Sequence, residues 1–235
     1  YKRLRKTKIF EAKVAKVHRI SSLNRVNANN IILVGLGKTA NLHCEVLRRS
    51  VAVAHKAAKS SKATSYLSLL NQVEVPNVTF TVAEAVLLAD YSFEAYKSKN
   101  GNKKTQIKKV FLWNNDLSAI SVQNKEIKRA EIIAKATNYA RNLVNTPPND
   151  LYPEVLAKEA RKLKAPNCKV TVFDEKALKR LGCNAILAVG NGSLRKPRLI
   201  IVDYHPNGTK KSLAIVGKGI TFDSGGLNIK PGSYM

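Results

Sequence analysis

The sequence predicts an α/β fold in two domains, and three observations support this. The apolar run from Asn30 to Gly37 ends in glycine, which is typical of a strand buried on both faces of a parallel sheet. Residues Leu42 to Lys59 follow with apolar positions at helical spacing. Pro147 and Pro148 then block a long helix, because proline lacks an amide hydrogen and restricts the preceding residue. We therefore expect an N-terminal α/β domain over 1–140 and a second domain over 141–235.

The first domain is expected to alternate strands with helices. After the amphipathic helix 42–59, Tyr66–Leu70 has the length and composition of a short strand. Val82–Tyr96 has an apolar helical face, and Ile107–Trp113 is a further strand candidate. Gln123–Leu143 is rich in helix formers and leads into the turn that contains the two prolines.

The same alternation continues in the second domain. A helix is predicted from Tyr152 to Leu163, and a short helix from Glu175 to Leu181 ends at Gly182. Four segments are predicted as strands: Lys169–Phe173, Ile186–Val189, Leu199–Tyr204 and Leu213–Val216. This order of elements predicts that the second domain also has an α/β architecture.

The composition restricts the class of protein and its partners. No apolar run approaches the roughly 18 residues of a membrane-spanning helix. Three scattered cysteines, Cys44, Cys168 and Cys183, favour reduced thiols in the cytoplasm, while the basic start at Tyr1 is compatible with a processed mitochondrial protein. The 41 Lys and Arg against 16 Asp and Glu give +25, which favours an acidic partner such as RNA or an acidic protein. The basic positions include Lys56, Lys59, Lys62, Lys103, Lys104, Lys108 and Lys109.

The segment from Leu213 to Pro231 carries the candidate chemistry. A buried strand would deliver Lys218 at its carboxyl end, where open α/β sheets bind ligands. Asp223 is a hard oxygen ligand for a divalent cation, and Lys218 could bind a metal as a neutral amine. Lys230 could polarise a carbonyl or stabilise an oxyanion. Taken as a local pattern, the same residues also fit a glycine-rich turn with two solvated lysines and an Asp cap.

The string Val216-Gly-Lys-Gly-Ile-Thr-Phe-Asp-Ser-Gly-Gly, followed by Lys230, resembles the first metal-binding signature of the leucyl aminopeptidase (cytosol aminopeptidase) family of metallopeptidases. Arg141-Asn-Leu-Val-Asn-Thr-Pro-Pro-Asn-Asp-Leu resembles the interdomain segment of that family, and Leu187-Ala-Val-Gly-Asn-Gly-Ser the strand and turn before its site. The resemblance implies a macro-like N-terminal α/β domain and a truncated metallopeptidase catalytic domain.

The resemblance also implies an activity. Lys218 and Asp223 would bind two divalent metal ions, zinc or manganese, and Lys230 would be catalytic in removing N-terminal residues from peptides. Bicarbonate would assist proton transfer, and the subunits would form a hexamer. The remaining family ligands have no counterpart in this chain, so we expect it to be inactive alone. The alternative is a structural or binding subunit of a large assembly with RNA or an acidic protein, which the +25 charge favours.

Overall fold

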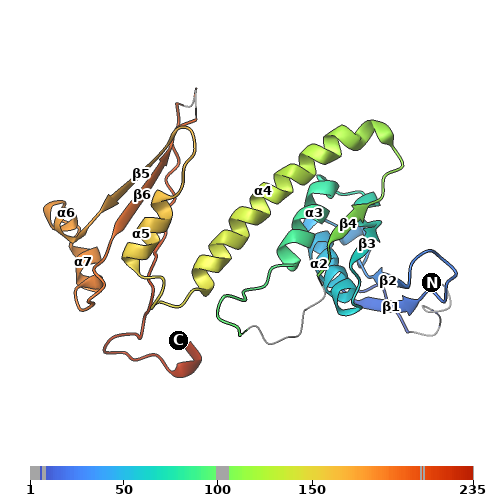
Figure 1. Ribbon diagram of the computed structural model, residues 1–235, viewed down its shortest axis with the longest axis horizontal. Coiled ribbons are helices and arrows are strands. Elements are labelled where there is room, and N and C mark those ends of the chain that lie inside the picture. Colours follow the sequence, from blue (N-terminus) through green and yellow to red (C-terminus); the bar gives the residue numbers. More distant parts are fainter. Residues whose placement is uncertain (1–5, 7–8, 99–105, 207, 209, 235) are drawn as a thin grey trace. The chain divides into compact units, whose positions relative to one another are not determined.

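The computed structural model describes residues 6, 9–98, 106–206, 208 and 210–234. The chain divides into two compact units, one ending at Asn142 and the other beginning at Leu143 (Figure 1). Each unit mixes helices with a two-stranded sheet or sheets, which confirms the predicted α/β class. Within the described residues, no helix combines the length and apolar content needed to cross a bilayer.

The described residues of the first unit include two small sheets and the helices α2 to α4. Strands β1 (Val17–Ser21) and β2 (Asn30–Val34) pair antiparallel, with Val17 opposite Val34. Strands β3 (Ser65–Ser68) and β4 (Lys109–Leu112) pair parallel, with Ser65 opposite Lys109. The helices are α2 (Cys44–Ser60), α3 (Val78–Ala89) and the long α4 (Ile120–Asn145), with short 3-10 turns at Thr39–Asn41, Leu70–Gln72 and Leu117–Ala119.

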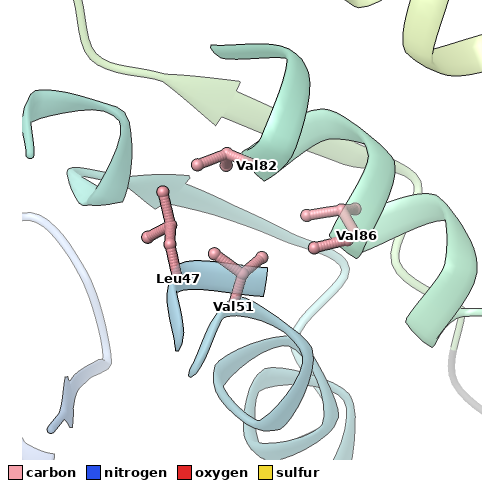
Figure 2. Close-up of a cluster of buried hydrophobic side chains, with 5 residues drawn as sticks. Leu47, Val51, Val82 and Val86 are labelled. Carbon is pink, nitrogen blue, oxygen red and sulfur yellow. The ribbon is translucent and has the colours of Figure 1, made fainter. Parts of the chain in front are cut away.

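The core of this unit lies between α2 and α3. Leu47 and Val51 from α2 meet Val82 and Val86 from α3, and Figure 2 shows these side chains pointing toward one another. Both pairs are four residues apart, so each helix presents one apolar stripe. Leu36, which follows β2, and Val110 and Leu112 of β4 pack against this cluster. The helical spacing in the sequence therefore predicted the buried face of α2 correctly.

The second unit has one antiparallel strand pair and short helices. Strands β5 (Cys168–Phe173) and β6 (Leu199–Tyr204) pair with Cys168 opposite Tyr204. The helices are α5 (Pro153–Arg161), α6 (Glu175–Arg180) and α7 (Asn184–Gly190), and a 3-10 turn covers Gly232–Tyr234. Helix α6 begins where Asp174 Oδ1 accepts the Ala177 amide at 2.9 Å, which satisfies one free N–H of the first turn.

Three expectations about strands are wrong. Ile186–Val189 lies inside helix α7, because a four-residue apolar run has no period that separates a helix from a strand. Leu213–Val216 forms no strand with the described residues, and its large side chains are almost fully exposed. The sheets are also mainly antiparallel, since only β3 and β4 run parallel. Strand β2 consequently is not the doubly covered strand of a parallel sheet.

Helix α3 starts at Val78, before the predicted start at Val82, and ends at Ala89, before the predicted end at Tyr96. Asn77 adopts a left-handed conformation, with φ of 50°, immediately before the helix, and the helix ends at Ala89. Asparagine tolerates this conformation better than most residues, so the chain can turn into the helix at this point. The predicted start was four residues late, because Val78 lies one helical turn before Val82 and packs against the same core cluster.

Candidate hydrolytic site

A glycine turn shapes the segment that carries the three candidate residues. Gly225 has φ of +89°, and a Cβ at this position would lie 2.1 Å from the carbonyl oxygen of Asn228. Only glycine fits both conditions without strain. The amide of Asn228 donates to the carbonyl of Gly225 at 3.2 Å, and the amide of Lys230 donates to that of Ser224 at 2.9 Å. These bonds reverse the chain and bring residues 223 and 230 together.

Asp223 and Lys230 form an ion pair across this turn. Lys230 Nζ donates to Asp223 Oδ2 at 2.7 Å, and Asp223 Oδ1 accepts the Gly225 amide at 2.9 Å. The hydrogen bond from Lys230 does most to lower the pKa of Asp223, followed by the bond from Gly225 and the charge of Lys230. Both side chains remain more than a third exposed. The turn therefore presents an ionised carboxylate beside an ammonium group.

Lys218 lies apart from this pair. It is exposed and makes no hydrogen bond or ion pair with the described residues. Its charge gives the smallest of the contributions that lower the pKa of Asp223. The structure thus brings Asp223 and Lys230 into contact. Lys218 affects Asp223 only through the electrostatic effect of its charge. The predicted strand that was to place Lys218 is absent from the described residues.

The donor set does not by itself fit two divalent ions. In the described part of the chain, no three His, Cys, Asp or Glu side chains gather as a metal site would require. Asp223 is the carboxylate of the turn, and both of its oxygens already accept hydrogen bonds. Hydrolytic metal sites need several ligands and an open position. The local geometry accordingly gives Asp223 and Lys218 as partial ligands at most, and no metal-dependent step follows from it.

Two models of one family match the chain on either side of its boundary. The cytosol aminopeptidase family N-terminal domain matches residues 1–100, and the catalytic domain of the same family matches residues 138–235. The chain belongs to the cytosol aminopeptidase family. The turn with Asp223 and Lys230 lies inside the part matched by the catalytic domain.

Curated relatives from the family align along nearly the whole chain. A probable cytosol aminopeptidase of Aquifex aeolicus is 38% identical over 240 residues, covering 100% of this chain and 47% of the relative. The corresponding protein of Streptomyces coelicolor is 40% identical over 223 residues, covering 87% of this chain and 42% of the relative. The chain spans about half the length of the curated relatives it matches.

Solved structures of similar proteins share the fold. The bottromycin maturation enzyme BotP in complex with Mn has a TM-score of 0.76 and 27% identity, covering 97% of this chain and 47% of that chain. A mutant of tomato leucine aminopeptidase has a TM-score of 0.77 and 27% identity, covering 94% of this chain and 45% of that chain. These matches agree with the mixed α/β architecture of both units.

A polar cluster in the first unit was not predicted from the sequence. His55 Nδ1 lies 3.1 Å from the Tyr66 hydroxyl, and His55 Nε2 lies 3.3 Å from Asp90 Oδ1. These residues are separated by 11 and 35 positions, so no spacing in the sequence connects them. The nearest signal was a lone histidine on the apolar side of helix α2.

Proposed function

We propose that this chain carries part of a metal-dependent aminopeptidase that removes N-terminal residues, including leucine, from peptides. The ion pair of Asp223 and Lys230 within the region matched by the catalytic domain is the observation that carries the proposal. The names of the curated relatives and of the tomato structure support the same activity. The Mn named with BotP supports a divalent metal.

Each candidate residue has a proposed role. Lys230 would hold its proton at Nζ and polarise the scissile carbonyl, because an ammonium group stabilises the oxyanion that forms on attack. Asp223 and Lys218 would bind two divalent ions, zinc or manganese, with bicarbonate assisting proton transfer. One carboxylate and one amine do not complete such a site. We therefore expect the chain of 235 residues to hydrolyse no peptide on its own.

Assembly and compartment are also proposals. A homo-oligomer, with a hexamer as its expected form, would follow from membership in this family. The relatives are named cytosol aminopeptidases, which supports a cytoplasmic location. A mitochondrial location is the alternative. Gradient centrifugation with molar-mass measurement, and fractionation of the source cells, would decide these two points separately.

The decisive experiment uses the protein encoded by the complete reading frame of the gene. We expect it to hydrolyse leucinamide only with added manganese or zinc, and we expect Lys230→Ala to remove that activity. Lys211→Ala, which neutralises an exposed lysine outside the turn, is the matched control and should stay active. A metal-loaded full-length protein that does not hydrolyse leucinamide or leucine-containing dipeptides would refute the proposal.

The second candidate function is binding of an acidic partner, RNA or an acidic protein. The amide of Lys108 donates to the Thr64 carbonyl at 2.7 Å, and Lys109 lies opposite Ser65 in the paired strands. Lys108 and Lys109 therefore lie close to Lys62, just beyond the end of α2. Lys103 and Lys104, which were predicted with this group, lie outside the described residues. A local excess of positive charge favours a polyanion.

Salt dependence tests this second function. Binding of a short single-stranded RNA should weaken steeply as salt is raised, because released counterions set the slope. Replacing both Lys108 and Lys109 with Gln should reduce the slope by about 1.4, if each lysine contacts one phosphate of the single strand. Lys176→Gln together with Lys179→Gln, in the other unit, is the charge-matched control. An absence of RNA binding at low salt would refute it.

A further inference from the structure

A cavity of about 310 Å³ lies within the first unit and includes none of the candidate hydrolytic residues in its lining. Its walls come from α3, β4 and α4, and one residue of α2, His55, also lines it. The walls are mainly apolar and include Val86, Leu87, Val110, Leu112 and Ile127. Pockets of roughly 300 Å³ or more with apolar walls and a few polar groups are the usual form of small-molecule sites.

Side chains of helix α4 contact α3 at three points. The Arg129 guanidinium lies 5.3 Å from the ring centroid of Phe80, and Arg141 Nη1 donates to the Leu88 carbonyl at 3.0 Å. The side chain of Asn138 donates from Nδ2 to the Leu87 carbonyl at 3.3 Å. Because these bonds hold the two helices together, the wall formed by α4 has a defined position.

The polar cluster on His55 places a charged carboxylate in the wall of the cavity. His55 is 1% exposed, and its Nε2 and Lys59 Nζ both contact Asp90 Oδ1, at 3.3 and 2.7 Å. Burial would raise the pKa of Asp90, but the hydrogen bonds from Lys59 and His55 outweigh it and lower the pKa below its ordinary value of 3.8. Both contacts end on Oδ1. Among the described residues, His55 and Lys59 bond to Oδ1 and not to Oδ2, so Oδ2 is the oxygen to which a ligand would donate.

The remaining charged residues of the cavity carry both signs. Lys108 and Lys109 supply cations, and Glu131 supplies a second carboxylate, all three with exposed side chains. A ligand can therefore be apolar along the walls, anionic at the lysines and cationic at Asp90 and Glu131. One water molecule occupies about 30 Å³ in the liquid. By this measure the cavity has room for a molecule of about ten non-hydrogen atoms.

We propose that this cavity is a binding site for a free apolar α-amino acid, with leucine as the representative ligand. The ammonium group would donate to Asp90 Oδ2 and Glu131, and the carboxylate would accept from Lys108 and Lys109. The side chain would lie against Val86, Leu87 and Ile127. The site itself stands on this geometry. Its use in sensing released amino acids rests on the proposed aminopeptidase function, because such amino acids would be the products.

Binding can be measured on the 235-residue chain by amide chemical-shift changes in NMR. Leucine titrated to about 20 mM should produce saturable shifts at Val86, Leu87, Val110 and Ile127, since ligands of this size bind in the millimolar range. Leucinamide, which lacks the carboxylate, and 4-methylpentanoate, which lacks the amine, should each bind at least tenfold more weakly. Saturable binding of both analogues with the affinity of leucine would overturn the assignment of charges.

Variants separate the cavity from the surrounding positive surface. Ala83→Phe fills the space and should abolish leucine binding, while Lys109→Gln and Glu131→Gln should each weaken it at least fivefold. Lys56→Gln, an exposed lysine of α2 that does not line the cavity, is the matched control. The two surface variants keep the test valid if Ala83→Phe fails to fold. Shifts confined to other residues, or no saturable shift at all, would overturn the proposal, and neither result depends on hydrolytic activity.

Discussion

Helix α2 and the segment Leu213–Val216 both carry large apolar side chains, but the surroundings of these side chains are opposite. On α2, Leu47 is 0% exposed and Val51 2% exposed. In the second segment, Leu213 is 86% exposed and Val216 95% exposed. An apolar pattern defines which side chains gain from burial, whereas burial itself requires an element that packs against them. Helix α3 packs against the apolar face of α2. No described element covers the segment Leu213–Val216.

The contrast extends to the polar groups of the two regions. In the first unit the buried His55 contacts Tyr66 of strand β3 and Asp90 at the end of helix α3. In the turn of the second unit, Asp223 is bonded by Gly225 and Lys230, both within seven residues along the chain. The first arrangement depends on tertiary packing and the second on local backbone geometry. Mutations should therefore affect global stability in the first region and local chemistry in the second.

The largest difference is expected from matched leucine truncations. Leu47→Ala should lower the free energy of unfolding by about 3 kcal/mol, because it removes a buried side chain and leaves a cavity. Leu213→Ala should change it by less than about 0.5 kcal/mol, as exposed positions do. Urea unfolding followed by circular dichroism measures both. Equal losses would mean that Leu213 is packed in solution and would break the comparison.

A smaller effect is expected from Asp90 and should depend on pH. The pKa of Asp90 in the folded protein is lower than its ordinary value of 3.8, so its ionised form stabilises the fold above that value. This contribution is lost as the pH falls through the folded pKa. Because the side chain is 45% exposed, we expect at most about 1 kcal/mol after screening by solvent.

Asp90→Asn checks this directly. Urea unfolding between pH 6 and about 3 should show a steeper loss of stability in the natural chain than in the variant. Glu74→Gln, which removes an exposed carboxylate from the same unit, is the control and should follow the natural chain. Parallel pH profiles for Asp90→Asn and the natural chain would show that the network contributes nothing to the titration.

Local pattern predicted the elements that are defined by their own residues. The buried face of α2, strands β5 and β6, and the break at Pro147 and Pro148 were all recognisable, because periodicity and proline act over a few residues. The direction of strand pairing was wrong, since it depends on where distant segments meet. Ile186–Val189 was wrong because the run is too short to show a period.

The same distinction applies to the candidate site. The glycines predicted a tight turn near Asp223, and Gly225 indeed has the positive φ that such a turn needs. The contact between Asp223 and Lys230 follows from that turn. The position of Lys218 could not be predicted from the local pattern, because the prediction assumed a strand at Leu213–Val216 that the described residues do not form. The cluster of His55, Tyr66 and Asp90 has no local signal at all.

A local effect is expected at the glycine turn. Gly225→Ala would place a Cβ 2.1 Å from the Asn228 carbonyl, so the turn must open and the ion pair must separate. The pKa of Asp223 should rise toward its ordinary value, as read from side-chain carboxyl shifts in NMR, while the urea midpoint stays unchanged. Gly217→Ala, where a Cβ meets no atom within 4 Å, is the matched control. An unchanged pKa in Gly225→Ala would show that the turn does not hold the pair.

The smallest effect compares the two lysines of the candidate site. Lys230→Met should raise the pKa of Asp223 more than Lys218→Met, because Lys230 provides the leading hydrogen bond and Lys218 only the weakest of the charge effects. The same carboxyl shifts measure both variants, and neither should move the urea midpoint, since exposed ion pairs contribute little to stability. A larger rise in Lys218→Met would place Lys218, rather than Lys230, beside Asp223 in solution. That outcome would remove the contact between Asp223 and Lys230 on which the proposed function rests.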